Sequence, residues 1–214
     1  PTSEGAKSVS LAIVHTSSNS SVSVTLNGVG VRRVQVKIVT VPPGREMKVD
    51  NNPFKAPGQF PWKADSIYII SVATPQDAPD HNKRFVFESW NDGHTSPTRD
   101  IIAPSSSTEY TAQFKIQHRL SMISAHGAPH FDEWTDLGES ASWLVTSPFS
   151  EPGEEGSGKR YVVATVEGSS FDDEEEKVSG SVVMDGAKTV NITWKPQHRL
   201  SMISAHGAPH FDEW

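Results

Sequence analysis

The sequence predicts an all-β fold built from tandem immunoglobulin-like β-sandwich domains. Three observations lead to this prediction. Apolar residues alternate with polar ones in many short runs, clusters of turn-forming residues separate the runs, and one long segment occurs twice. Short strands of this kind at regular spacing are typical of β-sandwiches.

The alternation has a period of two residues. Val34, Val36 and Ile38 alternate with Arg, Gln and Lys. Because successive side chains of a strand point to opposite faces, such a run has one apolar face. The same pattern occurs in the ranges 22–26, 110–116 and 190–194. Pro42-Pro43-Gly44 and Asn91-Asp92-Gly93 are typical turn segments between runs, and no stretch combines helical spacing with helix caps.

The duplicated segment is QHRLSMISAHGAPHFDEW, at Gln117–Trp134 and again at Gln197–Trp214. Weaker similarity lies upstream of both copies, between residues 110–115 and 190–195 and between residues 83–87 and 159–163. The spacing places extra residues of the second unit in an expected acidic loop, Asp172–Glu176. A fixed internal repeat indicates a repeated structural unit. We therefore expect domains at 1–116 and 117–196, with 197–214 as the start of a third repeat or a donor or terminal strand.

Composition argues against several partners. The net charge is −7, and the adjacent basic pairs are Arg32-Arg33 and Lys159-Arg160. Nucleic-acid-binding proteins carry a basic stripe, so we expect no nucleic-acid partner. The chain has no cysteine, which excludes disulfides and thiolate metal sites. No run of 18 apolar residues is present, so we expect no membrane span.

Three segments carry a resemblance to known surface modules. Thr40–Asp50, followed by Pro57, resembles a PEGA-like module, with Asn51 where that family has glycine. Residues 85–93 with 110–114 resemble the F-x-x-W-S-D-G … Y-T-A-x-F repeats of exported bacterial and archaeal proteins. Residues 194–200 are similar to the W-K-x-Q-Y-x-L repeats of archaeal surface proteins, with His198 in place of Tyr. The resemblance implies an extracellular stalk, coat or adhesive module at a bacterial or archaeal cell surface, and no catalytic residues.

Two groups of side chains are candidates for binding a metal ion. The first is a turn that presents imidazoles and a carboxylate, as Zn²⁺ or Cu²⁺ sites require. Its members are His126, His130 and Asp132 in the first copy and His206, His210 and Asp212 in the second. The second is the acidic run containing Asp172 and Asp173, whose oxygens suit Ca²⁺, the one cofactor considered. The favoured interpretation of both groups is a solvated loop.

Two asparagines match the N-glycosylation acceptor pattern, Asn19 and Asn191. The six tryptophans raise the alternative of a carbohydrate-stacking platform, but we expect most of them to pack in the core. Trp62 is the best candidate for exposure, and packing is the favoured role even there.

We expect a non-enzymatic structural module of a surface layer, stalk or filament. The sequence has no Gly-x-Ser-x-Gly elbow and no phosphate-binding glycine loop. The expected partner is another copy of the chain, joined head to tail by β-strand donation. The expected assembly strand contains Leu200, Met202 and Ile203, and the strand Ser8–Val14 is an alternative donor. Other functions left open are a carbohydrate- or host-binding adhesin domain that binds cell-surface glycans and an accessory domain of a secreted hydrolase.

Overall fold

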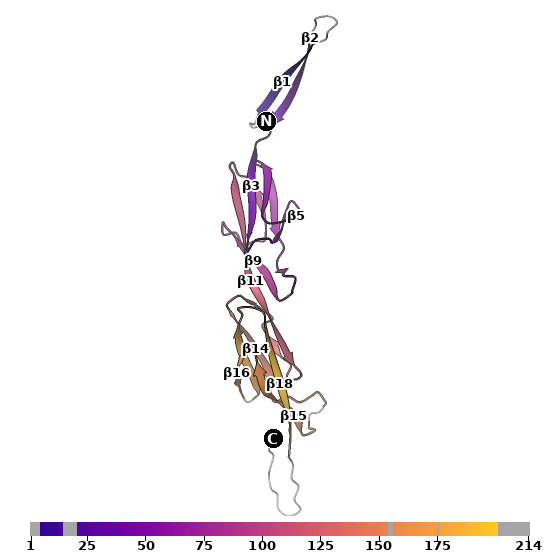
Figure 1. The fold of residues 1–214 in the computed structure, drawn as a ribbon, viewed down its shortest axis with the longest axis vertical. Coiled ribbons are helices and arrows are strands. Elements are labelled where there is room, and N and C mark those ends of the chain that lie inside the picture. The colour runs from indigo at the N-terminus through magenta and orange to yellow at the C-terminus, as the bar shows by residue number, and fades with distance from the viewer. Residues whose placement is uncertain (1–4, 15–20, 154–155, 175, 201–214) are drawn as a thin grey trace, which may run out of the picture. The chain divides into compact units, whose positions relative to one another are not determined.

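The computed structural model describes residues 5–14, 21–153, 156–174 and 176–200, and these residues form strands and no helix. This confirms the all-β prediction. The chain divides into two compact units (Figure 1). The first comprises Pro1–Gln76 and Phe87–Phe114, and the second comprises Asp77–Val86 and Lys115–Trp214. The boundary between Phe114 and Lys115 lies two residues before the one expected after residue 116. The repeat did not indicate that residues 77–86 belong to the second unit.

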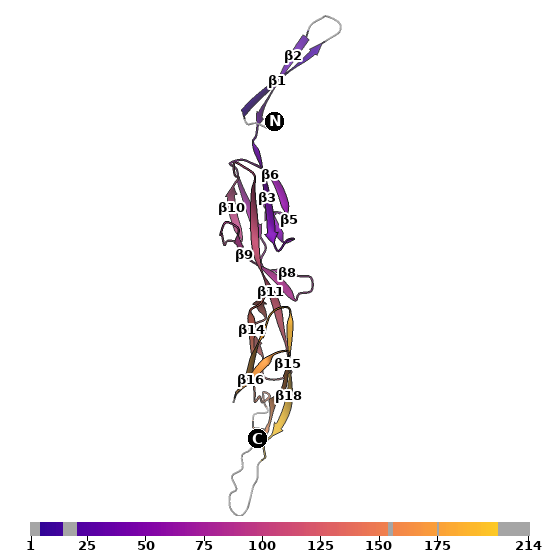
Figure 2. The same ribbon diagram turned by 60° about the vertical axis from the view of Figure 1, so that its left-hand side comes forward.

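The first unit begins with a hairpin of two long strands. Its strands are β1 (Gly5–Val14) and β2 (Ser21–Gly30), which pair antiparallel from Gly5↔Gly30 to Val14↔Ser21. They lie side by side and form a two-stranded sheet of their own (Figure 2). The described side chains of this hairpin are exposed, so the alternation in β2 marks an apolar face that the described chain does not cover.

The rest of the first unit contains two groups of paired strands. One is a four-stranded sheet in the order β10-β7-β4-β5, and the other contains β3, β6, β9 and the first part of β11. The strands are β3 (Arg33–Val41), β4 (Glu46–Val49), β5 (Asn52–Lys55), β6 (Gly58–Lys63), β7 (Ile67–Val72), β8 (Gln76–Asp77), β9 (Lys83–Trp90), β10 (Thr98–Ile102) and β11 (Thr108–Ser124).

Alternation in β3 produces the core of the first unit as predicted. Val34, Val36 and Ile38 are buried, and the residues between them are exposed or half-buried. They are joined by buried side chains of β4, β6, β7, β9 and β11, namely Met47, Val49, Trp62, Ile70, Val72, Trp90, Ala112 and Phe114. Trp62 is therefore a core residue, stacked on Tyr68 with ring centroids 4.3 Å apart.

The β4–β5 hairpin has asparagine at a turn position whose backbone conformation favours glycine. Asp50 and Asn51 form its two-residue turn with φ values of 47° and 66°. Two positive φ values are characteristic of a type I′ turn, and Asp and Asn tolerate this region better than other non-glycine residues. The carboxylate of Asp50 also accepts a hydrogen bond from the backbone N–H of Ile69, at 2.8 Å.

The second unit contains a four-stranded sheet in the order β12-β14-β17-β16 and a sheet formed by β15, β18 and the last part of β11. The remaining strands are β12 (His130–Phe131), β13 (Trp134–Asp136), β14 (Ser140–Thr146), β15 (Lys159–Glu167), β16 (Ser170–Asp173), β17 (Lys177–Val183) and β18 (Lys188–His198). Its core draws on strands of both sheets, so this unit is sandwich-like. The core residues are Leu120, Ala141, Trp143, Val145, Val178, Met184, Val190 and Ile192.

One expectation about this unit is wrong. Asp172 and Asp173 do not lie in a loop, because they belong to β16, which pairs with β17 from Ser170↔Ser181 to Asp173↔Val178. This strand is at the edge of its sheet. Charged side chains on an edge strand hinder further strand pairing, so an acidic run is compatible with a strand at this position.

The two units share a pattern of strand pairing. In the first, β3 pairs parallel with β11, from Thr108↔Val36 to Gln113↔Val41. In the second, β11 pairs parallel with β18, from Leu120↔Lys188 to Ser124↔Ile192. In addition, β9 pairs with β11, and β15 pairs with β18. Residues that the repeat aligns, 110–115 with 190–195 and 83–87 with 159–163, thus occupy corresponding strands.

Candidate functional site

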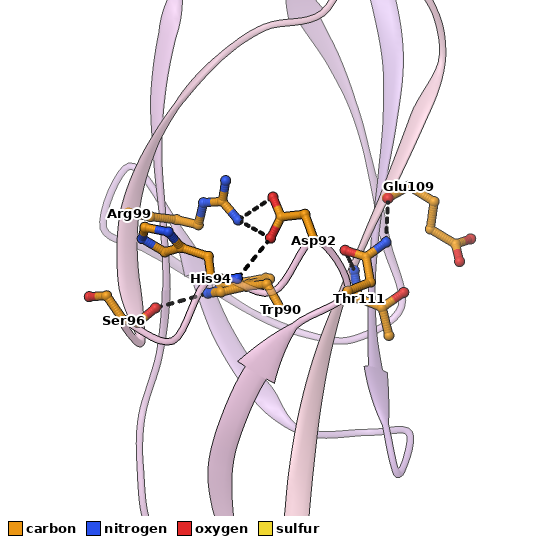
Figure 3. Close-up of polar contacts among 8 residues, drawn as sticks. Trp90, Asp92, His94, Ser96, Arg99, Glu109 and Thr111 are labelled. Atoms are coloured by element: carbon orange, nitrogen blue, oxygen red, sulfur yellow. Dashed lines mark hydrogen bonds and ion pairs between the residues drawn. The ribbon is translucent and has the colours of Figure 1, made fainter.

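The Trp90–Gly93 segment, which carries the resemblance to surface repeats, forms a connected polar cluster in the first unit (Figure 3). Trp90 is only 1% exposed, and its indole N–H donates to the backbone oxygen of Ser96 at 2.9 Å. Gly93 has a φ of +83°, which closes the turn after the tryptophan, and its N–H donates to the Trp90 oxygen at 2.9 Å.

Asn91 ties the same turn to strand β11 through Glu109 and Thr111, which are labelled in Figure 3. Its side-chain amide donates to the backbone oxygen of Glu109 at 3.3 Å and accepts from the N–H of Thr111 at 3.1 Å. The Asn91 backbone N–H donates to the Thr111 oxygen at 2.9 Å. An asparagine that satisfies backbone groups in this way acts as a structural connector.

Asp92 and Arg99 complete the cluster with a two-oxygen ion pair. Both carboxylate oxygens of Asp92 accept from Arg99 Nη1, at 2.8 and 2.7 Å, and one also accepts from the His94 N–H at 3.3 Å. Burial by itself raises the pKa of Asp92, but the hydrogen bonds from Arg99 and His94 and the charge of Arg99 outweigh it and lower the pKa below 3.8. The segment is therefore built to fix a loop between β9 and β10.

We expect Asp92→Asn to lower the free energy of unfolding of the first unit by about 1 kcal/mol at neutral pH, the value for a half-exposed ion pair with good geometry. Because the folded state lowers the Asp92 pKa, its stabilisation is present above the ordinary value of 3.8 and is lost as pH falls below it. Urea unfolding at neutral and acidic pH checks this. The difference in unfolding free energy between Asp92→Asn and wild type should be smaller at acidic pH. The control Asp77→Asn removes an exposed carboxylate on β8 and should change the unfolding free energy little at either pH.

The first copy of the duplicated segment is anchored by an arginine–glutamine contact. Arg84 Nε donates to Gln117 Oε1 at 2.7 Å, and the Arg84 guanidinium lies 4.5 Å from the centre of the Trp134 ring. The Gln117 amide also donates to Asp136 at 2.8 Å, which together with Lys115 holds the pKa of that carboxyl below its ordinary value. The contact thus binds both ends of the 18-residue segment to strand β9.

The same arginine–glutamine contact occurs at the second copy. Arg160 Nε donates to Gln197 Oε1 at 2.8 Å. Arg160 and Gln197 are the repeat counterparts of Arg84 and Gln117, with the same offsets that the sequence similarity shows. Trp214, the counterpart of Trp134, lies outside the described residues. Aligning the two repeats shows that both residues recur, but the contact between them is seen only in the structure.

His126 lies in an aromatic cluster in the second unit. Its ring stacks on Tyr161 with centroids 3.8 Å apart and meets Trp194 edge-on at 5.7 Å. His126 Nδ1 lies 2.5 Å from Glu151 Oε1. The Trp194 indole donates to Ser124 Oγ at 3.0 Å. These contacts engage the His126 ring in packing and in one carboxylate contact.

A shallow groove of about 680 Å³ lies on the β12-β14-β17-β16 sheet. Its lining includes His130, Asp132, Leu144, Asp172, Ser179 and Ser181. Asp132 is held by Ser142, whose Oγ and N–H donate to the same carboxylate oxygen at 2.6 and 2.9 Å and lower the pKa of Asp132. The groove therefore presents hydroxyls, carboxylates and one imidazole on a β-sheet surface.

The metal candidates are distributed over different places. His130, Asp132 and Asp172 line the groove, whereas His126 belongs to the aromatic cluster and Asp173 lies at the end of β16. Across the described ranges, no three His, Asp or Glu side chains gather in an arrangement that would hold a metal ion. His206, His210 and Asp212 lie outside those ranges.

The remaining sequence candidates have mixed positions. Asn191 is half-buried on β18 between β11 and β15, and Asn19 lies outside the described residues. Leu200 is exposed, whereas Met202 and Ile203 of the expected assembly strand are outside the described part. The alternative donor, Ser8–Val14, is already paired with β2 along its length. Among the tryptophans, Trp62, Trp90 and Trp143 are buried, and Trp134 and Trp194 are half-buried.

The described residues contain no helix that is long and apolar enough to cross a membrane. In comparisons with protein-family models, curated proteins and solved structures, nothing matches this chain.

Proposed function

We propose that this chain is a non-enzymatic structural module of an extracellular surface protein, built from tandem immunoglobulin-like β-sandwich domains. The observation that carries the proposal is the recurrence of one design in both units. Each has a parallel strand pair, β3 with β11 in the first and β11 with β18 in the second. The arginine–glutamine contact recurs at the start of both copies of the duplicated segment. Repetition of a unit at fixed spacing is how spacers and coats gain length.

The roles of the polar residues support the same function. Asn91, Asp92 and Arg99 use their side chains to close a loop and to connect strands. The His126 ring and the Asp132 carboxylate are likewise engaged by neighbouring side chains. Catalytic groups must be poised toward a substrate, whereas these groups satisfy one another and hold the fold.

The proposed location is the surface of a bacterium or archaeon, and the proposed partner is a further copy of the chain. The resemblance of residues 40–57 and 85–114 to surface modules supports the location. Head-to-tail joining by β-strand donation gives a surface layer, stalk or filament, since a contact between two different patches propagates into an open chain of copies when its rotation does not close a ring. The proposed donor is the segment 197–214. The alternative donor is Ser8–Val14, which would exchange its pairing with β2 for pairing with the next copy. Head-to-tail contact through the intact hairpin is a further route to the same linear assembly.

Sedimentation velocity of the full chain over a wide concentration range tests the proposal. We expect reversible, concentration-dependent growth into a series of oligomers, with linear particles in negative-stain electron micrographs. A single monomeric species at every concentration would contradict self-assembly. A closed dimer that does not grow further would contradict the head-to-tail arrangement.

The groove of the second unit supports a second candidate, a carbohydrate-binding adhesin domain. Serine hydroxyls and carboxylates pair with sugar hydroxyls, and the exposed Phe131 and Phe171 are among the lining residues. A glycan array followed by calorimetry tests it. Binding should be lost in Leu144→Arg, which places a long side chain in the groove, and retained in Val183→Arg, an exposed position on the same sheet. Absence of binding to any glycan, or equal binding by both variants, rejects this candidate.

A further inference from the structure

The N-terminal hairpin has an apolar face that no other strand of the described chain covers. Val9 and Leu26 are cross-strand partners and are 63% and 59% exposed, and Val24 lies on the same face of β2 as Leu26. Lys7 is on this face too, two residues before Val9. The opposite face is mostly polar, with Ser8, Ser10, Thr25 and Asn27. We call the first surface, made of Lys7, Val9, Val24 and Leu26, the hairpin face.

A second uncovered apolar surface lies on the four-stranded sheet of the first unit. Ile67 of β7 and Ile102 of β10 are cross-strand partners and are 66% and 68% exposed. Ile69 lies beside them and pairs with Asp100. We call this surface, made of Ile67, Ile69, Asp100 and Ile102, the isoleucine face. Beyond it the sheet turns polar, with Thr98, Ser71 and Lys48 in the next row.

The two faces complement each other in chemistry and in charge. Each has three aliphatic side chains from two paired antiparallel strands, and each has exposed charge at its border. The hairpin face has the cation Lys7. The isoleucine face has the anion Asp100, and the exposed Asp50 lies beside Ile69, whose backbone N–H donates to it at 2.8 Å. Lys7 and Asp100 are exposed, and neither has an ion pair within the described part of the chain. Lys48 lies on β4, on the other side of β7 from β10 and Asp100. Its positive charge repels Lys7 and so directs Lys7 toward Asp100.

We propose that the hairpin face of one copy packs on the isoleucine face of the next copy, with Lys7 paired to Asp100. This inference rests on the proposed head-to-tail assembly and specifies the contact. Apolar surface drives the association, and the opposite charges fix its direction. Because the two faces differ, a bound pair of copies still has one free hairpin face and one free isoleucine face, and the chain of copies can grow from both ends. Three aliphatic side chains on each side suit a Kd in about the micromolar range, as weak single contacts in polymers have.

Complementation of two blocked variants gives the sharpest test. Leu26→Lys blocks the hairpin face, and Ile67→Lys blocks the isoleucine face. In sedimentation velocity, each variant alone should be monomeric at concentrations where wild type associates. An equimolar mixture should form heterodimers and nothing larger. Only one hairpin face and one isoleucine face remain compatible in the mixture, and the heterodimer uses both. Ser8→Lys, which adds the same charge to the opposite face of the hairpin, is the matched control and should assemble like wild type.

A charge exchange tests the register. Lys7→Glu and Asp100→Lys should each weaken association at least tenfold at low salt. The double variant should recover to within about threefold of wild type, because the pair is restored with its charges reversed. The five positions substituted in these tests, Lys7, Ser8, Leu26, Ile67 and Asp100, are exposed, so circular dichroism should show an unchanged β fold in every variant.

The outcomes separate this inference from the proposed function. If wild type forms oligomers but Leu26→Lys and Ile67→Lys assemble equally well, head-to-tail assembly stands and the contact proposed here is wrong. If Leu26→Lys abolishes association and Ile67→Lys does not, the hairpins bind each other and the contact is again wrong. If wild type is monomeric throughout, both the assembly and this contact are rejected.

Discussion

Replacing Trp90 by alanine is expected to lower the free energy of unfolding of the first unit by about 3–5 kcal/mol, the usual cost of removing a buried tryptophan from a core. Trp90 is 1% exposed, contacts Phe87 with ring centroids 5.7 Å apart and lies under the Arg99 guanidinium. The loss is a large part of the stability of a typical domain, so we expect the first unit to populate unfolded states at room temperature. Hydrogen exchange of its peptides, monitored by mass spectrometry, measures the change.

Two further substitutions separate packing from hydrogen bonding at this position. Trp90→Phe retains a ring but leaves the Ser96 backbone oxygen without its indole donor, which should cost about 1–2 kcal/mol. Trp134→Ala removes a half-buried tryptophan of the second unit and should leave exchange in the first unit unchanged. Equal exchange in wild type and Trp90→Ala would show that the WNDG segment is not part of the core.

Gly180→Ala is expected to destabilise the second unit by about 3 kcal/mol, at the upper end of the cost of overpacking. A methyl group at this position would meet the backbone oxygen of Ser170 and would lie 2.7 Å from Trp143 Cζ2. Ser170 belongs to the adjacent strand β16, and Trp143 is a core residue. Neither can move without breaking strand pairing or core contacts. We expect β16 to lose its pairing with β17, which hydrogen exchange of residues 170–173 reports.

Gly186→Ala provides the matched control in the same unit. A methyl group there would meet nothing within 4 Å. Its stability should remain within about 0.5 kcal/mol of wild type, the range for surface substitutions. If both alanine variants lower the thermal unfolding temperature equally, the destabilisation comes from the loss of glycine itself and not from crowding around Gly180.

The sequence predicted the strands well because alternation is a local property. Val34, Val36 and Ile38 were expected on one face and are buried together. The same pattern in β2 also gave a strand, yet Val24 and Leu26 are exposed. Alternation indicates which face of a strand is apolar but not which surface covers it. That second fact depends on long-range packing, or on a partner, and so it could not be deduced from the run of residues.

The candidate site was less predictable for the same reason. His126 and His130 were expected to present their imidazoles together on one turn. In the structure His126 packs on Tyr161, and His130, in β12, pairs with Leu144 of β14. The partners that separate them come from distant parts of the chain. Glu151, which contacts His126, belongs to no recognisable motif, and no sequence signal indicated it. Asn91 and Asp92 were recognised as part of a repeat motif, but their backbone connections required the structure.

The hairpin of β1 and β2 has a consequence for the kinetics of assembly. A two-stranded hairpin on its own is only marginally stable in water. A partner that binds the ordered hairpin stabilises it by mass action, so its protection from proteases should rise with protein concentration. Each added copy must then meet the cost of ordering its own hairpin before it gains from burial. Because this cost is the same at every step, assembly by this route would grow stepwise without a lag, and preformed seeds would not accelerate it.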